Sequence, residues 1–290
     1  MLAPAASTPP PLDDLDARPG SATSLLRTIV GALFRMHDGW MPTATVIALL
    51  GDVGVAEAPA RTALHRVKVR GLLVPERRAE RAGYRLAAGA DALLERGDRR
   101  IHEPRTMPAD DPQWCLIAFR IPEDQRDARH QLRRRLSWIG AGTVTPALWI
   151  TPAFLRDEVT GIVGDLRLEL YVTIFTARDA AHDDAPLPEL VTRWWDLDAI
   201  RALHDRFLDG HGARDAGVVD DQAAFATWIR TLDAWRPIPY LDPGLPASLL
   251  PEDWPGHQST ELFLRIRRST RAKAESYAAR LLASRAREPH

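Results

Sequence analysis

Residues 57–86, EAPARTALHRVKVRGLLVPERRAERAGYRL, decide how the N-terminal part of this chain folds. Apolar side chains recur at three- and four-residue spacing over residues 60–67, which is typical of one face of a helix. Gly71 follows at the place where such a helix would end. Two short strands, 72–74 and 84–86, are expected to flank a charged turn. This order of a helix and a two-stranded ribbon predicts the recognition helix and wing of a winged helix-turn-helix.

The outer surface of this helix and ribbon carries the side chains that we expect to contact DNA. Arginine and hydroxyl groups hydrogen bond to base edges in the major groove, and arginine also pairs with phosphates. The alternative is an ordinary helix and hairpin with solvated charges. The predicted DNA-contacting residues are Arg61, Thr62, His65 and Arg66 on the helix, and Arg77, Arg78, Arg81 and Arg85 on the ribbon.

The charge of the chain is distributed unevenly, although its formal net charge is only −1. Residues 57–105 contain 12 Lys and Arg against 7 Asp and Glu, whereas residues 178–290 contain 15 against 18. The positive charge therefore lies where the helix and ribbon are expected, as a DNA-binding surface requires. All basic residues except Lys68 and Lys273 are arginine, so the choice of arginine is not itself evidence for phosphate binding.

The sequence also limits the compartment and the chemistry. There is one cysteine, Cys115, which cannot form an internal disulfide or a zinc cluster. No apolar run reaches the 18 residues of a membrane span, and the first residues lack the features of a secretory signal, so a cytoplasmic protein without membrane contact is expected. Phosphate-loop, dinucleotide-binding and nucleophile motifs are missing, and the histidines do not pair at metal spacing. We therefore predict no enzymatic activity, no catalytic residue and no metal site.

The chain is expected to be an α+β protein made of three folded parts. Residues 113–180 show the order βαββαβ, which is typical of a ferredoxin-like domain. A single helix is expected over 187–208, and a stretch containing six prolines follows at 236–256. The predicted parts are a disordered tail (1–22), a winged helix-turn-helix DNA-binding domain (23–103), a linker (104–112), a central ferredoxin-like domain for dimerisation or effector binding (113–180) and a helical C-terminal domain with one or both of these roles (181–290).

With these residues laid out, the chain resembles the PaaX family of transcriptional regulators of phenylacetate breakdown. The first matching stretch is R-T-A-x-x-R-x-x-x-x-G-L-L at 61–73, closed by Tyr84-Arg85-Leu86. The second is L-R-R-R-L-x-W-I-G at 132–140 with P-A-L-W-I-T-P at 146–152. The third and most specific is L-D-P-x-L-P-x-x-L-L-P-x-x-W-P-G at 241–256.

The resemblance implies a winged-helix domain, a ferredoxin-like domain and a helical domain. It also implies a dimeric repressor that binds duplex operator DNA and is released by an aryl-CoA thioester such as phenylacetyl-CoA, with no other cofactor. The phosphates of such an effector suit arginines, and its aryl ring suits aromatic walls. The predicted effector-binding residues are Arg133, Arg134, Arg135, Trp149, Trp235, Arg236, Tyr240 and Trp254.

The chain departs from the family pattern at two places. The family usually has a histidine just before the Tyr/Trp-Arg pair that leads into its L-D-P stretch, but here residues 232–236 read LDAWR. A regulator that answers to a different small ligand is therefore an alternative. The start of the predicted recognition helix, Ala58-Pro59-Ala60, is also unusual, which leaves the operator open.

The predicted central domain is also similar to the small CRISPR-associated ferredoxin-like nucleases. Those enzymes place a metal-binding aspartate at the end of the first strand, where this chain has Phe119-Arg120-Ile121. A cation cannot bind the metal, so a nuclease-like fold without nuclease chemistry is expected. The alternatives are an enzyme, nuclease-like or CoA-ester-processing, that uses the central and C-terminal domains, and an RNA-binding or scaffolding protein.

Overall fold

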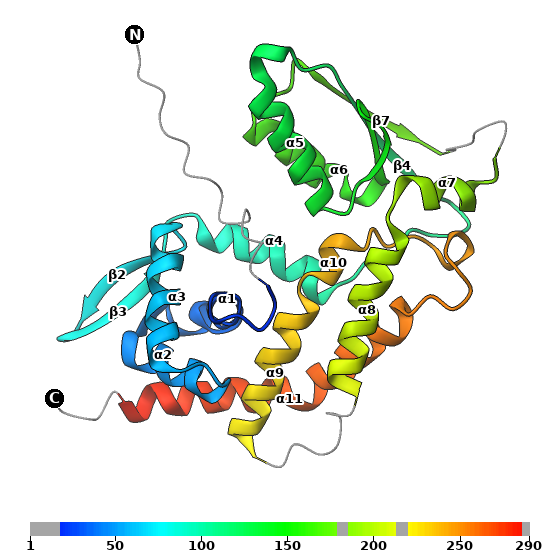
Figure 1. Cartoon of the computed structure of the whole chain (residues 1–290). Coiled ribbons are helices and arrows are strands. Elements are labelled where there is room, and N and C mark those ends of the chain that lie inside the picture. The colour runs from blue at the N-terminus through cyan, green and yellow to red at the C-terminus, as the bar shows by residue number, and fades with distance from the viewer. Residues whose placement is uncertain (1–17, 179–184, 213–219, 286–290) are drawn as a thin grey trace, which may run out of the picture. The chain divides into compact units, whose positions relative to one another are not determined.

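A computed structural model describes residues 18–178, 185–212 and 220–285. The protein is α+β, with a winged helix near the N-terminus, a central ferredoxin-like antiparallel sheet and C-terminal helices (Figure 1). Most of the predicted N-terminal tail, residues 1–17, lies outside the described residues. Two compact units are present: unit 1 comprises 1–99, 209–236 and 261–290, and unit 2 comprises 100–208 and 237–260. The predicted domains follow one another along the chain, whereas each unit combines separate segments.

Unit 1 begins with three helices and a small sheet. Fully buried side chains such as Leu26, Ile29 and Leu64 fill the space between the helices, as the three-and-four spacing of apolar residues predicts. The sheet has the order β1-β3-β2 with antiparallel pairing. The elements are α1 (Ala22–Leu33), a 3-10 turn (Phe34–His37), β1 (Trp40–Pro42), α2 (Thr43–Asp52), α3 (Glu57–Val69), β2 (Leu73–Arg78) and β3 (Arg81–Leu86).

The β2–β3 hairpin is longer and its turn is tighter than the sequence predicted. Arg78 pairs directly with Arg81, so only Ala79 and Glu80 form the turn. Both have positive φ, 46° and 64°, which a two-residue turn of this kind requires. The prediction of a long charged turn between residues 74 and 84 is therefore wrong. Pro75 argued against a strand at this place, because proline has no amide hydrogen to donate. It is tolerated because β2 is an edge strand.

The remaining helices of unit 1 include α9 and α11, which pack against each other through large aromatic side chains. Trp235 of α9 is 1% exposed and stacks on Phe263 of α11, with ring centroids 4.6 Å apart and an interplanar angle of 11°. Trp228 stacks on the same ring at 5.9 Å. The bounds of these helices are α4 (Ala90–His102), α9 (Asp221–Trp235) and α11 (Gly256–Arg285), and the first residues of α11 and the last of α4 belong to unit 2.

Unit 2 contains a four-stranded antiparallel sheet with the strand order β5-β6-β4-β7. Helices α5 and α6 lie on one face of this sheet (Figure 1). The chain order β4-α5-β5-β6-α6-β7 confirms the predicted βαββαβ arrangement. Its elements are β4 (Trp114–Phe119), α5 (Arg126–Trp138), β5 (Gly142–Thr145), β6 (Leu148–Pro152), α6 (Arg156–Asp165) and β7 (Val172–Ala177).

Apolar side chains pack on both faces of this sheet. Alternate side chains of a strand point to opposite faces, so Cys115 and Ile117 pack under α5 and α6 while Trp114 faces the other way. Burial raises the pKa of the Cys115 thiol, partly offset by Thr151 and Arg156. The second face is covered by apolar residues of α7, α8 and the proline-rich segment. The helices of this layer are α7 (Leu187–Trp194) and α8 (Leu197–His211), and the proline-rich segment begins with the short helix α10 (Ile238–Leu241).

The single helix predicted over residues 187–208 is wrong, because the chain leaves the helical conformation at Trp195. This residue has extended backbone, with φ −121° and ψ 142°. Its ring is 5% exposed and lies in the apolar cluster, and its indole N–H donates to the carbonyl of Gly140 at 2.8 Å. Asp196 then caps α8 by accepting a hydrogen bond from the Ala199 amide at 2.9 Å. Burial of one tryptophan thus breaks a run that is apolar enough to be continuous.

Candidate nucleic-acid interface

The outer surface of α3 carries polar side chains, several of which contact one another. Ala56 offers no capping side chain, but the carboxylate of Glu57 lies in the first turn, where the helix dipole favours negative charge. Arg61 donates to that carboxylate from Nε and Nη2 at 2.9 and 2.7 Å. Thr62 bonds back to the carbonyl of Ala58 at 3.1 Å. The four predicted residues of α3 are all exposed, including His65, so the polar face is available to a ligand.

These exposed residues form two neighbouring stripes on the helix. Residues four apart lie above one another on a helix, so Ala58, Thr62, Arg66 and Arg70 form one stripe. All four line a cavity beside the start of α1. Arg61 and His65 belong to the other stripe and are not part of the cavity lining. The recognition helix therefore presents one open face and one face that forms the wall of a groove.

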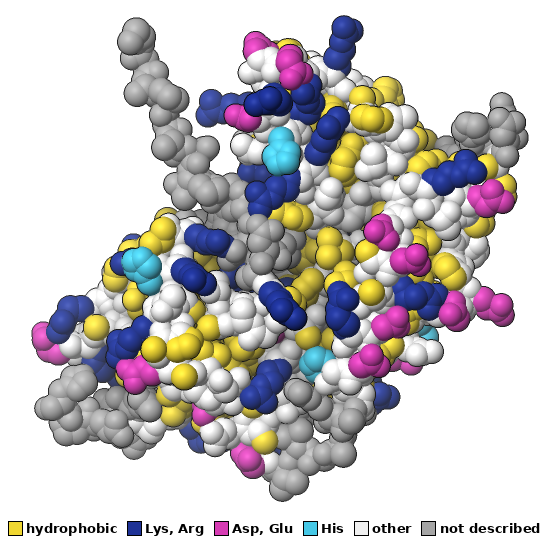
Figure 2. Space-filling view, in the orientation of Figure 1, with side chains coloured by type: hydrophobic (Ala, Val, Ile, Leu, Met, Phe, Trp, Pro, Cys, Tyr) yellow, Lys and Arg dark blue, Asp and Glu magenta, His cyan; other side chains and the backbone are white. Residues whose placement is uncertain are grey.

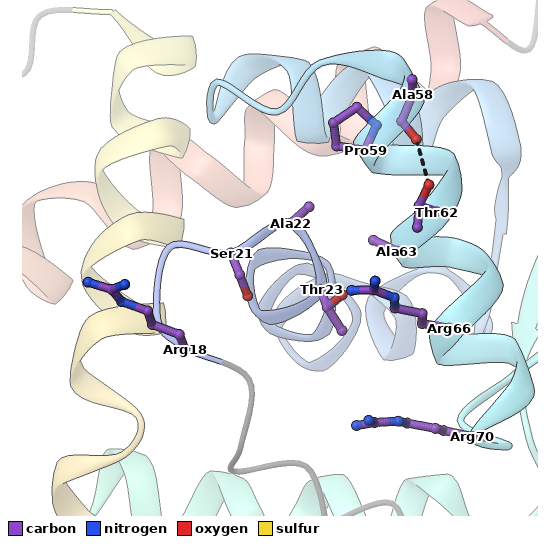
Figure 3. A pocket seen from close by; sticks show the side chains of 10 residues that line it. All are labelled: Arg18, Ser21, Ala22, Thr23, Ala58, Pro59, Thr62, Ala63, Arg66 and Arg70. Carbon is purple, nitrogen blue, oxygen red and sulfur yellow. Dashed lines mark hydrogen bonds between the residues drawn. The ribbon is translucent and has the colours of Figure 1, made fainter.

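The groove between α1 and α3, which we call the α1–α3 groove, has a volume of about 720 Å³. In Figure 3, Arg66 and Arg70 extend from α3 on the side of the first turn of α1, whereas the guanidinium of Arg18 turns away from them. No Asp or Glu contributes to the lining. Its ten residues are Arg18, Ser21, Ala22, Thr23, Ala58, Pro59, Thr62, Ala63, Arg66 and Arg70.

The arginines of the wing are held by contacts within the hairpin. The guanidinium groups of Arg78 and Arg81 lie over the ring of Trp40 from β1, 5.2 and 5.8 Å from its centroid. Glu76 binds Arg78 Nε at 2.5 Å and Arg85 Nε at 3.0 Å. Such contacts restrict the conformations of these arginine side chains.

Basic side chains are consequently displayed together over α3 and the hairpin (Figure 2). Arg77 donates from Nη2 to Glu80 in the turn, to the carbonyl oxygen of Glu80 at 2.9 Å and to its carboxylate at 3.3 Å. The structure therefore brings the predicted helix residues and the predicted wing residues into one unit, on elements that follow each other directly.

Of the ten residues that line the α1–α3 groove, only Thr62 and Arg66 were predicted as ligand contacts. Arg70 could have been found, because it continues the four-residue stripe of Thr62 and Arg66 beyond the last helical residue. Arg18 and Thr23 carried no signal, because they reach the groove only through the packing of α1 on α3. Local periodicity does not report which helix lies beside which.

The three arginines of α5 that were predicted to bind an effector make contacts within unit 2. Arg133 donates to the carbonyl of Pro146 at 2.7 Å. Arg134 lies over the ring of Trp138, 4.3 Å from its centroid. The side chain of Arg135 is 11% exposed and lies 3.5 Å from Asp165. Only Arg134 is fully exposed on the surface, so the run RRR does not form one cationic cluster.

The predicted aromatic walls are distributed between the two units. Trp149 faces α5 and α6 in the core of unit 2, and Trp235 is stacked in unit 1. Arg100 covers Tyr240 at 4.9 Å, and Arg201 covers Trp254 at 5.5 Å.

Arg236, in unit 1, donates to Ser24 Oγ at 3.2 Å. None of the eight predicted effector residues lines the α1–α3 groove. Their shared role stays a prediction.

A buried polar cluster in unit 2 was not predicted. His204 of α8 is 1% exposed and contacts Ser259 Oγ through Nδ1 at 2.5 Å and Asp242 Oδ2 through Nε2 at 2.8 Å. This order of Ser, His and Asp resembles an acyl-transfer triad, but Ser259 is completely buried and also donates to the Gly256 carbonyl at 3.0 Å. The cluster therefore fixes the L-D-P segment and the start of α11, and it offers no accessible nucleophile.

The L-D-P segment is fixed further by a glycine that no other residue can replace without movement. Gly244 has φ +70°, and a Cβ added there would lie 2.1 Å from the carbonyl oxygen of Arg105. Its amide bonds to Asp242 Oδ1 at 2.8 Å, and its carbonyl accepts from Met107 at 2.8 Å. The specific sequence of this segment thus has a structural cause in unit 2.

A second buried carboxylate lies in unit 1. Asp233 is 1% exposed and accepts hydrogen bonds from Ser24 Oγ at 2.6 Å and Thr28 Oγ1 at 2.8 Å through Oδ1. Its Oδ2 accepts from the Gly20 amide at 2.6 Å, and Arg236 lies 3.8 Å from the carboxylate. Asp233 thereby attaches α9 to the start of α1, next to the α1–α3 groove. The position that lacks the family's histidine is in this packed region.

Among residues 18–178, 185–212 and 220–285, no group of three or more His, Cys, Asp or Glu side chains is placed to hold a metal ion. Arg120 follows β4, where the related nucleases carry their aspartate, and it is exposed. Within the same residues, no helix combines the length and the apolar character needed to cross a membrane.

The fold and this surface define a winged-helix protein joined to a ferredoxin-like domain and C-terminal helices. Residues 21–90 match the description "PaaX-like protein", residues 108–188 "PaaX protein central Cas2-like domain", and residues 195–280 "PaaX-like protein C-terminal domain". The chain belongs to the PaaX family. It is similar to the Transcriptional repressor PaaX of Escherichia coli (strain K12), with 26% identity over 259 residues that cover 87% of this chain and 81% of the relative.

A solved structure is similar to this chain over most of its length. An uncharacterized protein from Mycobacterium tuberculosis superposes with a TM-score of 0.52 and is 26% identical. The match covers 89% of this chain and 99% of that one. The combination of the parts is thus shared with a solved protein, which itself has no described function.

Proposed function

We propose that this protein is a DNA-binding transcriptional repressor of an aromatic-acid catabolic pathway of the phenylacetate type. The observation that carries the proposal is the exposed polar face of α3 followed by an arginine-bearing wing, in a chain similar to a named transcriptional repressor. The open stripe with Arg61 and His65 faces base edges in the major groove, and Arg77, Arg78, Arg81 and Arg85 face phosphates. Thr62 and Arg66 lie between these base contacts and the α1–α3 groove.

The repressor acts as a homodimer in this proposal. One winged helix contacts only a few base pairs, so adequate specificity needs two half-sites about one helical turn apart, or a multiple of that spacing. Light scattering at micromolar concentration and footprinting on the protein's own promoter test this. A monomer together with a footprint that lacks any repeat would contradict the dimer.

An aryl-CoA thioester such as phenylacetyl-CoA is proposed as the effector that releases the DNA. Release requires tighter binding of the effector to the DNA-incompetent state, with a coupling of about 1–3 kcal/mol, or roughly 5–150-fold in DNA affinity. The LDAWR sequence at 232–236, where the family has a histidine, favours a related but different ligand as the second candidate. Calorimetry with phenylacetyl-CoA, related thioesters and the free acids separates the two.

A gel shift with duplex DNA from the protein's own promoter tests the proposal as a whole. We expect a shifted and uncut duplex, with or without Mg²⁺ or Mn²⁺, and a smaller shift after a thioester is added. Cleavage of the duplex would favour the nuclease alternative, and hydrolysis of the thioester would favour a CoA-ester-processing enzyme. If no thioester binds below about 100 µM or alters the shift, the effector class is wrong while the DNA-binding proposal stands, because coupling is measured separately from DNA affinity.

A further inference from the structure

The α1–α3 groove has the chemistry of a phosphate site. Its lining contains three arginines and no carboxylate. It also contains the first turn of α1, where the amides of Ala22 and Thr23 have no acceptor within the helix. Backbone amides at a helix start and guanidinium groups are both donors that suit a phosphate oxygen.

An unused hydroxyl points to the same ligand. Thr23 is 8% exposed and lines the groove. Unlike Ser24 and Thr28, whose hydroxyls donate to Asp233, its hydroxyl makes no hydrogen bond with the residues that the structure describes. The residue is more than nine-tenths buried while its hydroxyl stays open to the groove, so an acceptor in the groove would complete its hydrogen bonding. Arg66 and Arg70 lie along the same wall.

We propose that the α1–α3 groove binds a phosphate of the DNA backbone, held by Arg70, Thr23 and the first turn of α1, with Arg18 at the rim. This inference rests on the proposed function and extends it beyond the predicted contacts. Thr62 and Arg66 belong both to the groove and to the exposed face of α3. A phosphate in the groove therefore lies directly beside the bases that α3 reads, and it fixes how far the helix enters the major groove.

The groove is anchored to the rest of unit 1 by the buried carboxylate described above. Ser24 and Thr28, the next polar residues of α1, are bound by Asp233, and Gly20 is bound from the other side. These contacts hold the first turn of α1 in place without using the Thr23 hydroxyl. The phosphate site is therefore prepared before DNA arrives, which lowers the entropic cost of binding.

Salt dependence separates a charged contact from a neutral one, and this gives a sharp test. Each phosphate neutralised by a cation contributes about −0.9 to the slope of log K against log salt concentration. In a salt series with a duplex of arbitrary sequence, Arg70→Ala should lower the affinity and reduce the slope by about one unit. Thr23→Val should lower the affinity at every salt concentration and leave the slope unchanged, because a hydroxyl displaces no counterion.

Lys273→Ala is the matched control for the lost charge, because Lys273 is an exposed cation of α11 outside the groove. Thermal unfolding of each variant shows that it is folded, and both groove side chains can be truncated without removing a contact to Asp233. If Arg70→Ala keeps the wild-type slope, or if Lys273→Ala changes it equally, the phosphate site is refuted. If the wild-type protein binds no duplex even at low salt, the proposed function itself is wrong.

A small phosphorylated ligand would satisfy the same donors, and a competition experiment distinguishes it. Coenzyme A, 3′,5′-ADP or inorganic phosphate is added to the protein–DNA complex at constant ionic strength. The DNA assignment predicts that none of them displaces DNA at micromolar concentration through this groove. If coenzyme A displaces DNA from the wild type and not from Arg70→Ala, the groove is a small-ligand site and the assignment to the DNA backbone is overturned.

Discussion

The outer face of α3 and the inner face of α9 both carry charged and hydroxyl side chains, but they serve opposite purposes. On α3 the side chains are exposed, and a pair such as Arg61 and Glu57 is 62% and 64% exposed. On α9 Asp233 is 1% exposed and satisfies donors from α1. Exposed ion pairs contribute roughly 0–1 kcal/mol, whereas a buried polar group without its partner costs about 1–3 kcal/mol or more. The α3 residues can therefore specialise for binding, while the α9 residue is required for folding.

The largest expected effect comes from replacing the buried carboxylate. Asp233→Leu leaves two hydroxyls and one amide without their acceptor and removes the carboxylate beside Arg236, so we expect a loss of about 3–5 kcal/mol in unfolding free energy. Urea unfolding followed by tryptophan fluorescence measures it. The exposed Asp209→Leu is the control and should change little.

A combined variant removes the hydroxyl donors together with the carboxylate. Replacing both partners of a buried hydrogen bond by apolar groups can be nearly neutral. The triple variant Ser24→Ala, Thr28→Val, Asp233→Leu should therefore recover part of the stability lost by Asp233→Leu alone. If the single substitution is already neutral, the distinction between the two helix faces fails.

The next largest effect is expected in unit 2. His204→Phe keeps an aromatic ring but removes both nitrogens, which leaves Ser259 and Asp242 without their partner and should cost about 2–3 kcal/mol. His65→Phe on the exposed face of α3 is the matched control, with less than about 0.5 kcal/mol expected. Equal melting temperatures for the two variants would show that burial does not decide the role of these histidines.

A smaller effect, on DNA affinity and not on stability, is expected for the open stripe of α3. Arg61→Ala should weaken operator binding by roughly 1–3 kcal/mol and relax base preference. Arg81→Ala on the wing should instead weaken all duplexes alike and reduce the salt slope by about one unit. Binding to a pool of randomised duplexes measures both. If both variants lose the same base preference, then α3 and the wing do not have the separate roles of contacting bases and contacting phosphates.

The smallest effect concerns His37, at the end of the 3-10 turn after α1. Burial lowers the pKa of its imidazole below 6.5, and the neighbouring carboxylate of Asp38 opposes this only in part. The unfolded chain therefore takes up the proton more readily, and His37 makes stability fall as the pH drops through 6.5. Stability measured between pH 8 and pH 5 should decrease less in His37→Gln than in the wild type. An equal or steeper decrease in His37→Gln would contradict this sign.

Periodic elements were predictable because their signals are local. The apolar residues of α3 and of the βαββαβ domain repeat within a few positions, so the recognition helix, the order of the elements in the central domain and three separate family motifs could be found without coordinates. The tight turn at Ala79-Glu80 was missed, because neither residue is typical of positive φ. The break at Trp195 was missed because it depends on burial against Gly140, which no local pattern reports.

The sequence by itself determined the family, the order of the folded parts and the exposed polar face of α3, since each depends on residues close together in the chain. Only the tertiary structure decided which polar residues are buried and which remain available. Ser24 and Asp233 are 209 positions apart, and His204 and Ser259 are 55 apart. Arg18 and Arg70 reach one groove, whereas Trp149 and Trp235 are packed in different units. Contacts over such separations form only when helices pack, because helix periodicity specifies a buried face but not its partner.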